Sequence, residues 1–244
     1  MTIDRSPSLT EQVMSHLKER IRGGEFHDSR IPPETELAAD LGVSRTTVRD
    51  ALSRLEHEGF VVRRQGSGTW VNRPVLQIKS RLEEIWSYEQ MLRDHGYTPS
   101  VRVRSMRRRP AVPDDADALG IATGDEVLEI EKVFLEDDVP AVLTRNRIPQ
   151  CGITTPIPSD AGGEPIFEFL DRHCGLRLAY YLSEIVPAVL DADRAEALGV
   201  AEGTASICFE ETGFDAADSP VVRATSWFRD DLVRFRLMRR RIGG

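Results

Sequence analysis

The strongest constraint on the fold of this chain comes from two helical segments that only three residues separate. Gly42 ends the segment over residues 34–41, and Ser44 is placed to cap a second helix over residues 45–57. The second segment repeats apolar side chains at i, i+3, i+4 and i+7, namely Val48, Ala51, Leu52 and Leu55. Two amphipathic helices joined by a short turn containing glycine predict a helix-turn-helix.

A further helix is expected upstream, over residues 9–22. Ser8 and Glu11 form a capping-box pattern at its start, and two glycines follow its end. Downstream of the helix-turn-helix, residues 60–64 and 69–71 are rich in β-formers and enclose a turn with two glycines. The order predicts a β-hairpin wing behind the second helix of the pair.

Formal charge is distributed unevenly along the chain, whose net charge is −8. Residues 1–75 hold 11 basic and 11 acidic side chains, whereas residues 76–244 hold 21 basic and 29 acidic ones. Six arginines fall within residues 44–73. A local basic patch of this kind is what phosphate contact requires, and the acidic remainder is expected to keep DNA at that patch.

The second helix of the pair presents candidate DNA contacts. Its apolar face leaves Arg45, Thr46 and Arg49 pointing outward, and the early residues of such a helix meet base edges in the major groove. Thr47 lies in the first turn of this helix and Ser44 is its cap, so both are candidate DNA contacts, and the Thr47 hydroxyl can donate to a phosphate. The alternative is a solvated face with Arg49 paired to a nearby glutamate.

The expected wing adds a second set of candidates. Glycine lets the backbone approach DNA closely, and arginine favours the negative potential of the minor groove. The candidate contacts there are Arg64, Gln65 and Gly66. The alternative is a plain solvated hairpin.

The rest of the chain contains an internal repeat. Residues 118–124 and 197–203 both read Ala-Leu-Gly-Ile/Val-Ala-x-Gly, and each copy continues into a strand-like run, an acidic turn, a proline and another strand-like run. Two such units can pair their hairpins into one antiparallel sheet with helices on one face, which predicts an α+β domain. We expect a winged helix-turn-helix over 1–75, a linker and bridging helix over 76–96, and an effector-binding domain over 97–244.

Alternation along the expected strands selects candidate ligand contacts. Lys132 shares a face with Leu128, Ile130 and Phe134, whereas Glu129 and Glu131 lie on the other face and are expected to be solvated. A buried lysine is costly unless it is paired or given an anion. The candidate effector contacts are Lys132, Arg145, Arg147, Arg223 and Tyr180. The cations indicate either an anionic effector or internal pairs with residues such as Glu184 or Glu210.

The motifs VSRTTVRDAL and RQGSGTWV, within residues 32–71, resemble the GntR family of bacterial repressors. The resemblance implies DNA contacts by Arg45, Thr46, Thr47, Arg49 and Gly66, and binding as a homodimer to a palindromic operator. Thr35 stands where many members have a DNA-contacting arginine, which implies a partly different operator preference.

Residues 95–240 resemble the UTRA domain of the HutC-like subfamily, through the strand, acidic turn and proline at 127–149 and the final TSWFRDDLVRFRL. The resemblance implies a chorismate-lyase-like fold that binds a small effector. In this family, two arginines that hold a sugar phosphate often occupy the positions of Lys132 and Phe134. Lysine and phenylalanine there imply an effector other than the usual amino-sugar phosphate.

Other classes of protein lack support in the sequence. The three cysteines, Cys151, Cys174 and Cys208, are far apart, which argues against a disulfide framework or a zinc site. Neighbouring His173 and Cys174 do not face each other on a helix, and residues 76–244 show no catalytic constellation. No secretory signal or membrane-spanning run is found. We therefore expect a cytoplasmic regulator without a cofactor or a metal, and no enzyme.

Overall fold

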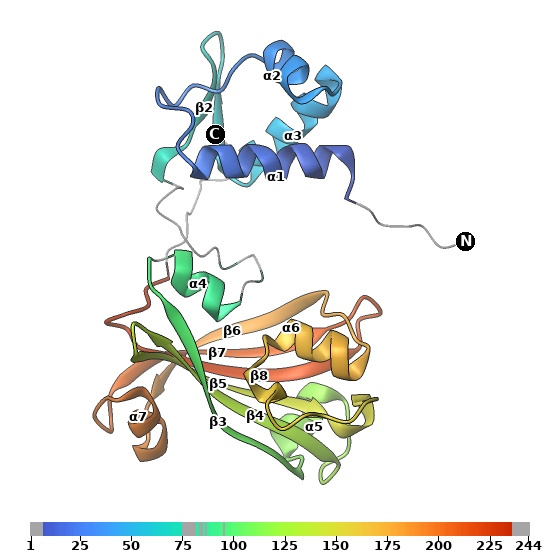
Figure 1. Ribbon diagram of the computed structural model, residues 1–244, viewed down its shortest axis with the longest axis vertical. Coiled ribbons are helices and arrows are strands. Elements are labelled where there is room, and N and C mark those ends of the chain that lie inside the picture. The colour runs from blue at the N-terminus through green and yellow to red at the C-terminus, as the bar shows by residue number, and fades with distance from the viewer. Residues whose placement is uncertain (1–6, 75–81, 83–84, 86, 95, 236–244) are drawn as a thin grey trace. The chain divides into compact units, whose positions relative to one another are not determined.

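A computed structural model describes residues 7–74, 82, 85, 87–94 and 96–235 of the chain. The chain divides into two compact units at residue 79, and each unit is considered by itself (Figure 1). The domain limits at residues 75 and 97 remain predictions.

The N-terminal unit is a winged helix-turn-helix, as the sequence predicts. Its elements are α1 (Leu9–Arg22), α2 (Glu34–Leu41), α3 (Arg45–His57), β1 (Val61–Arg64) and β2 (Gly68–Val71). The two strands pair in antiparallel fashion, with Arg64 opposite Gly68. The core is built from α1, α2, α3 and the base of the wing, and includes Leu17, Leu37, Leu52, Leu55 and Phe60.

Local chemistry sets the ends of these helices. The Ser8 side chain accepts from the amide of Glu11, whose carboxylate accepts from the amide of Ser8, so the predicted capping box is present. Gly42 has a φ of 64°, the left-handed conformation that ends α2 and turns the chain into α3.

The C-terminal unit is built on a six-stranded antiparallel sheet in the order β3-β4-β5-β8-β7-β6. The strands are β3 (Pro99–Pro110), β4 (Glu126–Glu136), β5 (Val139–Pro149), β6 (Tyr180–Val189), β7 (Ala205–Phe214) and β8 (Pro220–Phe228). The helices are α4 (Tyr88–Asp94), α5 (Pro113–Leu119), α6 (Ile166–Phe169), which continues as a π turn over Leu170–Cys174, and α7 (Ala192–Leu198). Short 3-10 turns span Gln150–Gly152 and Ala161–Gly163.

The internal repeat corresponds to two halves of this sheet. Helix α5 leads into the hairpin β4-β5 and helix α7 into the hairpin β7-β8, and the hairpins join where β5 pairs with β8. Each helix packs against the other half, α5 on β8 and α7 on β5. Gly120 after α5 lies beside Pro220, and Gly199 after α7 lies beside Pro140.

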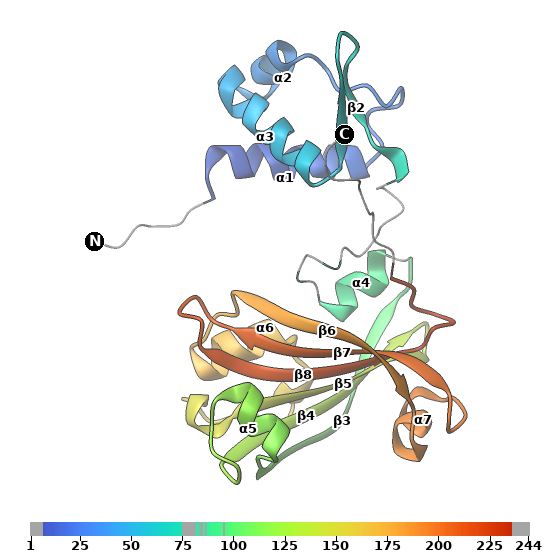
Figure 2. The same cartoon turned by 180° about the vertical axis from the view of Figure 1, so that it is seen from behind.

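The sheet has two differently covered faces. The α5/α7 face carries the repeat helices (Figure 2), where Val127 packs with Leu119 of α5 and Trp227 packs with Leu198 of α7. The α4/α6 face is covered by the other helices, where Phe134 packs with Leu92 of α4. The repeat helices share one face as expected, but the sheet is covered on both faces.

Candidate functional site

Helix α3 presents an exposed row of polar side chains in the N-terminal unit. Val48, Ala51, Leu52 and Leu55 are buried beneath it. Arg45, Thr46 and Arg49 are exposed, and neither arginine takes part in an ion pair with another described residue. The packed underside fixes the helix, while the outer row remains available to a ligand.

The start of α3 is held by two hydroxyls. Ser44 accepts from the amide of Thr47 over 3.1 Å, and the two side-chain oxygens are 2.8 Å apart. This cap satisfies one of the amides that a helix start leaves unpaired. Ser44 and Thr47 therefore order the first turn that carries Arg45 and Thr46.

The wing is joined to α3 through Arg63. Its Nη2 donates to the carbonyl oxygen of Arg49 over 3.1 Å, and its amide donates to the Glu56 carboxylate over 3.0 Å. Gln65 and Gly66 are exposed at the tip, where Gly66 has a φ of 74°, and Arg64 lies over the Trp70 ring at 5.3 Å. The candidate contacts of helix and wing thus belong to one packed unit.

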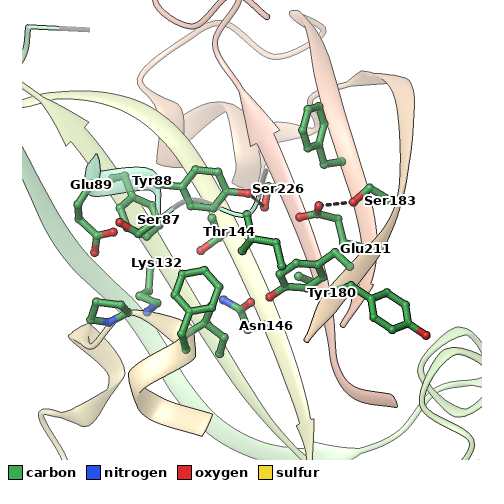
Figure 3. Close-up of a pocket in the computed structure, with 18 of the residues that line it drawn as sticks. Ser87, Tyr88, Glu89, Lys132, Thr144, Asn146, Tyr180, Ser183, Glu211 and Ser226 are labelled. Atoms are coloured by element: carbon green, nitrogen blue, oxygen red, sulfur yellow. Dashed lines mark hydrogen bonds between the residues drawn. The ribbon is translucent and has the colours of Figure 1, made fainter. Parts of the chain in front are cut away.

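A cavity of about 380 Å³ opens on the α4/α6 face of the C-terminal unit (Figure 3). Its size suits a small molecule. Polar groups from α4, from the residue before it and from five strands line it, namely Ser87, Tyr88, Glu89, Lys132, Thr144, Asn146, Ser183, Glu211 and Ser226. Apolar and aromatic side chains form much of the remaining wall.

Lys132 is the one cationic side chain among the described residues that line this cavity, and it lies on the face that strand alternation predicts. The side chain is only 2% exposed, and burial lowers its pKa to about 8, although Glu89 and Glu164 act in the opposite direction. Its ammonium donates to the carbonyl oxygen of Glu164. An ammonium has three donors, so Lys132 can also bind an acceptor from a ligand.

Glu211 is a cavity residue that sequence reasoning missed. It accepts from the Ser183 hydroxyl over 2.5 Å, and burial raises the pKa of its carboxyl group. The signal that could have found it is the repeat itself, because Glu211 occupies in the second copy the position that Lys132 occupies in the first.

Further polar groups line the cavity. The Tyr88 hydroxyl donates to Ser226 over 2.7 Å. The buried Thr144 hydroxyl has no hydrogen-bond partner among the residues that the structure describes. A buried hydroxyl without a partner is unfavourable, so Thr144 can favour a ligand that supplies one.

Arg145, Arg147 and Arg223, which are predicted as effector contacts, do not line this cavity. All three lie on the α5/α7 face, because the register sets Arg145 opposite Glu131, Arg147 opposite Glu129 and Arg223 opposite Thr212. Their guanidinium groups form internal pairs: Arg145 with Glu131 at 2.7 Å, Arg147 with Asp115 at 3.3 Å, and Arg223 with Glu210 at 3.1 Å. The alternative of internal pairs therefore describes all three arginines, and Glu210 is the partner of Arg223.

The expectation that Glu129 and Glu131 face solvent is also wrong. They are 3% and 7% exposed. Arg107 and Arg109 bind Glu129, and Arg104 and Arg145 bind Glu131. Buried carboxylates need such partners, and arginines of β3 and β5 supply them.

Tyr180 lies at the edge of the cavity. It is among the lining residues, but its hydroxyl donates to Asp218 over 2.8 Å and its ring stacks on Phe214 at 5.1 Å. These contacts occupy its polar end, so Tyr180 can offer mainly its ring edge and backbone.

No metal-binding cluster of three or more His, Cys, Asp or Glu side chains occurs within the described residues. The three cysteines are free thiols, and burial raises the pKa of Cys174 and of Cys208 to about 11. Across the same part of the chain, no helix has the length and apolar character to cross a membrane.

Comparison with known proteins agrees with this architecture. Residues 9–71 match the model for bacterial regulatory proteins of the gntR family, and residues 94–234 match the UTRA domain. The HTH-type transcriptional repressor NagR of Bacillus subtilis is 27% identical over 92% of this chain and 91% of its own. The HTH-type transcriptional regulator Rv0792c of Mycobacterium tuberculosis is 31% identical over 96% of this chain and 85% of its own.

A solved structure, that of the possible transcriptional regulator YydK from Bacillus subtilis, shares the fold with a TM-score of 0.69. It is 18% identical and covers 94% of this chain and 99% of its own. The winged helix-turn-helix, the six-stranded sheet and the matched models lead to one assignment. The chain belongs to the GntR family of DNA-binding transcription regulators, in the HutC/NagR-like subfamily that carries a UTRA domain, and this is a family of regulators rather than enzymes.

Proposed function

We propose that this protein is a cytoplasmic transcriptional repressor whose operator affinity is controlled by a small molecule bound in the cavity of its C-terminal unit. The observation that carries the proposal is the exposed row of Arg45, Thr46 and Arg49 on a helix whose other face is buried. Early residues of the second helix in a helix-turn-helix read bases in the major groove.

The candidate contacts are of two kinds, base contacts that read sequence and phosphate contacts that position the protein on the duplex. Arg45 and Arg49 can each contact a guanine through two hydrogen bonds, and Thr46 can meet a thymine methyl group. Phosphate contacts fix the orientation of the protein on the duplex without reading sequence. The positioning contacts are assigned to Ser44, Thr47, Arg64, Gln65 and Gly66.

We assign the repressor a homodimeric state, with the β6 edge of the sheet as the interface. Strand β6 ends the sheet, and it exposes Leu182 by 66%, Ile185 by 52% and Val189 by 69%. The other edge strand, β3, carries arginines, and charged edges resist pairing. An apolar edge suits a second copy of the same strand, and a twofold dimer suits a palindromic operator.

The cavity offers a route for control. Ser183 and Ile185 of β6 line it, so a bound effector would touch the strand assigned to the dimer interface. An effector that binds one dimer arrangement more tightly shifts the population towards it, and DNA affinity changes with the spacing of the two α3 helices.

Operator selection from random DNA tests the proposal. The full-length protein should enrich one palindromic sequence and bind it more tightly than unrelated DNA at physiological salt. The variant Arg45→Ala/Arg49→Ala should lose this enrichment, whereas Arg177→Ala, which removes an exposed charge in the C-terminal unit, should keep it. Failure to enrich any sequence would contradict the proposal.

A further inference from the structure

Lys132 and Glu211 occupy equivalent positions in the two copies of the internal repeat. Each lies 14 residues after the alanine that opens its Ala-Leu-Gly motif, at Ala118 and Ala197. Lys132 belongs to β4 and Glu211 to β7, the first strand of each hairpin. Both line the same cavity (Figure 3), so the duplication places opposite charges at related points of one site.

The two charges do not neutralise each other. Within the described residues, Lys132 donates to the carbonyl oxygen of Glu164, Glu211 accepts from Ser183, and no ion pair joins Lys132 to Glu211. Lys132 is buried and Glu211 is half-buried, and burial disfavours the charged form of each. A ligand that brings the complementary charge to each would relieve this cost.

The wall between the two charges is mainly apolar. Aromatic side chains from α4, α6 and three strands contribute to it, namely Tyr88, Phe134, Phe167, Tyr181 and Phe209. Burial raises the pKa of Tyr88 and of Tyr181, and the charge of Glu211 acts in the same direction on both. The middle of the site suits a compact apolar or aromatic body.

We propose that the cavity binds a small amphoteric molecule, with its anionic group on Lys132, its cationic nitrogen on Glu211 and its apolar body between them. This assignment rests on the proposed function only in taking the cavity as the effector site. A purely anionic ligand would leave the carboxylates of Glu89 and Glu211 unmatched, and a purely cationic ligand would leave Lys132 unmatched.

Calorimetric titration of the full-length protein with a matched probe set tests the assignment. The probes are para-aminomethylbenzoate, which carries both charges, para-toluate, which lacks the amine, and para-methylbenzylamine, which lacks the carboxylate. Linear α,ω-amino acids of increasing length, titrated in parallel, measure the distance that the site spans.

The probe with both charges, or a linear amino acid of matching length, should bind roughly 10- to 100-fold more tightly than its singly charged analogues, the range expected for one charge-assisted hydrogen bond. Lys132→Met and Glu211→Gln should each remove this advantage. Glu210→Gln, which changes the neighbouring carboxylate on the opposite face, should retain it. The exchange Lys132→Glu/Glu211→Lys should restore binding that either single reversal abolishes.

Equal affinity for singly and doubly charged probes, or no binding of any doubly charged probe at millimolar concentration, would overturn the assignment. Retention of the advantage in Glu211→Gln would overturn it as well. Operator binding by the same variants, measured without probe, keeps the two proposals apart, because the substitutions lie outside the DNA-binding unit. A wild-type protein that binds its operator but prefers a singly charged probe would refute the ligand class alone.

Discussion

The Nη2 atom of Arg63 in the wing lies 3.1 Å from the carbonyl oxygen of Arg49 in α3. The same side chain also approaches the Glu56 carboxylate, with Nε 3.5 Å from Oε2. A side chain of the wing is therefore hydrogen-bonded to the backbone of α3, the helix that is proposed to read DNA.

Replacement of Arg63 should loosen the wing without removing a proposed base contact. Arg63→Met is expected to lower the free energy of unfolding by about 1 kcal/mol, the net worth of a typical hydrogen bond, and to weaken operator binding on all sequences alike. Chemical denaturation and fluorescence anisotropy measure the two effects. Arg177→Met serves as the matched control, and selective loss at one base pair would indicate that Arg63 itself reads DNA.

The buried ammonium of Lys132 should destabilise the folded state. Its pKa of about 8 lies below the ordinary lysine value of 10.5, so the unfolded chain holds the proton more tightly. Lys132→Met is therefore expected to raise the free energy of unfolding by about 1–3 kcal/mol at neutral pH. The gain should be complete below pH 8, decline between pH 8 and 10.5, and vanish above pH 10.5, where Lys132 is neutral in the folded and in the unfolded state. Denaturation across this pH range measures the gain, and a pH-independent difference would contradict the account.

Asp115 should anchor the ion pairs on the α5/α7 face. It is 1% exposed, binds Arg109 at 2.6 Å and Arg147 at 3.3 Å, and accepts from the amide of Val112. Asp115→Asn is expected to lower the free energy of unfolding by roughly 3–5 kcal/mol, because it removes the buried carboxylate that the buried Arg147 and the half-buried Arg109 share. Thermal and chemical denaturation measure the loss. Asp117→Asn on the same helix is the control, and a loss no larger than that of the control would show that the pairs do not depend on Asp115.

The β6 edge should carry the dimer contact. Leu182→Arg introduces a charge on the strand assigned to the interface, and it is expected to convert the dimer to a monomer in sedimentation velocity experiments. Val139→Arg is the matched control, because Val139 is an exposed valine, 42% accessible, at the start of β5 and away from β6. A dimer that survives Leu182→Arg, or dissociates equally in both variants, would place the interface elsewhere.

The DNA-binding unit could be predicted from sequence because its signals are local. The cap at Ser44, the left-handed Gly42 and the apolar spacing of α3 each act within a few residues, and α2 and α3 have the predicted bounds. The repeat was equally visible, and its consequence, one sheet built from two hairpins, follows from the pairing of β5 with β8.

The residues of the cavity could not all be predicted from the alternation of side chains along each strand. Alternation shows which side chains share a face of one strand, but it does not show how neighbouring strands are aligned. The observed register sets Arg145 opposite Glu131 rather than beside Lys132, which turns the arginine away from the cavity. Glu211 could not be recognised from alternation, because it becomes a cavity residue only when α4 and β6 form the cavity wall with it, and that arrangement belongs to the tertiary structure.

Arg45→Ala can show whether the exposed face of α3 reads the DNA sequence. Equilibrium binding is measured on the selected operator and on a set of single-base variants, for wild type and Arg45→Ala. If Arg45 contacts one base, the variant should lose about 1–3 kcal/mol of binding free energy at one base position only, and should no longer discriminate between bases there. Uniform weakening on every sequence, or unchanged discrimination at every position, would contradict it.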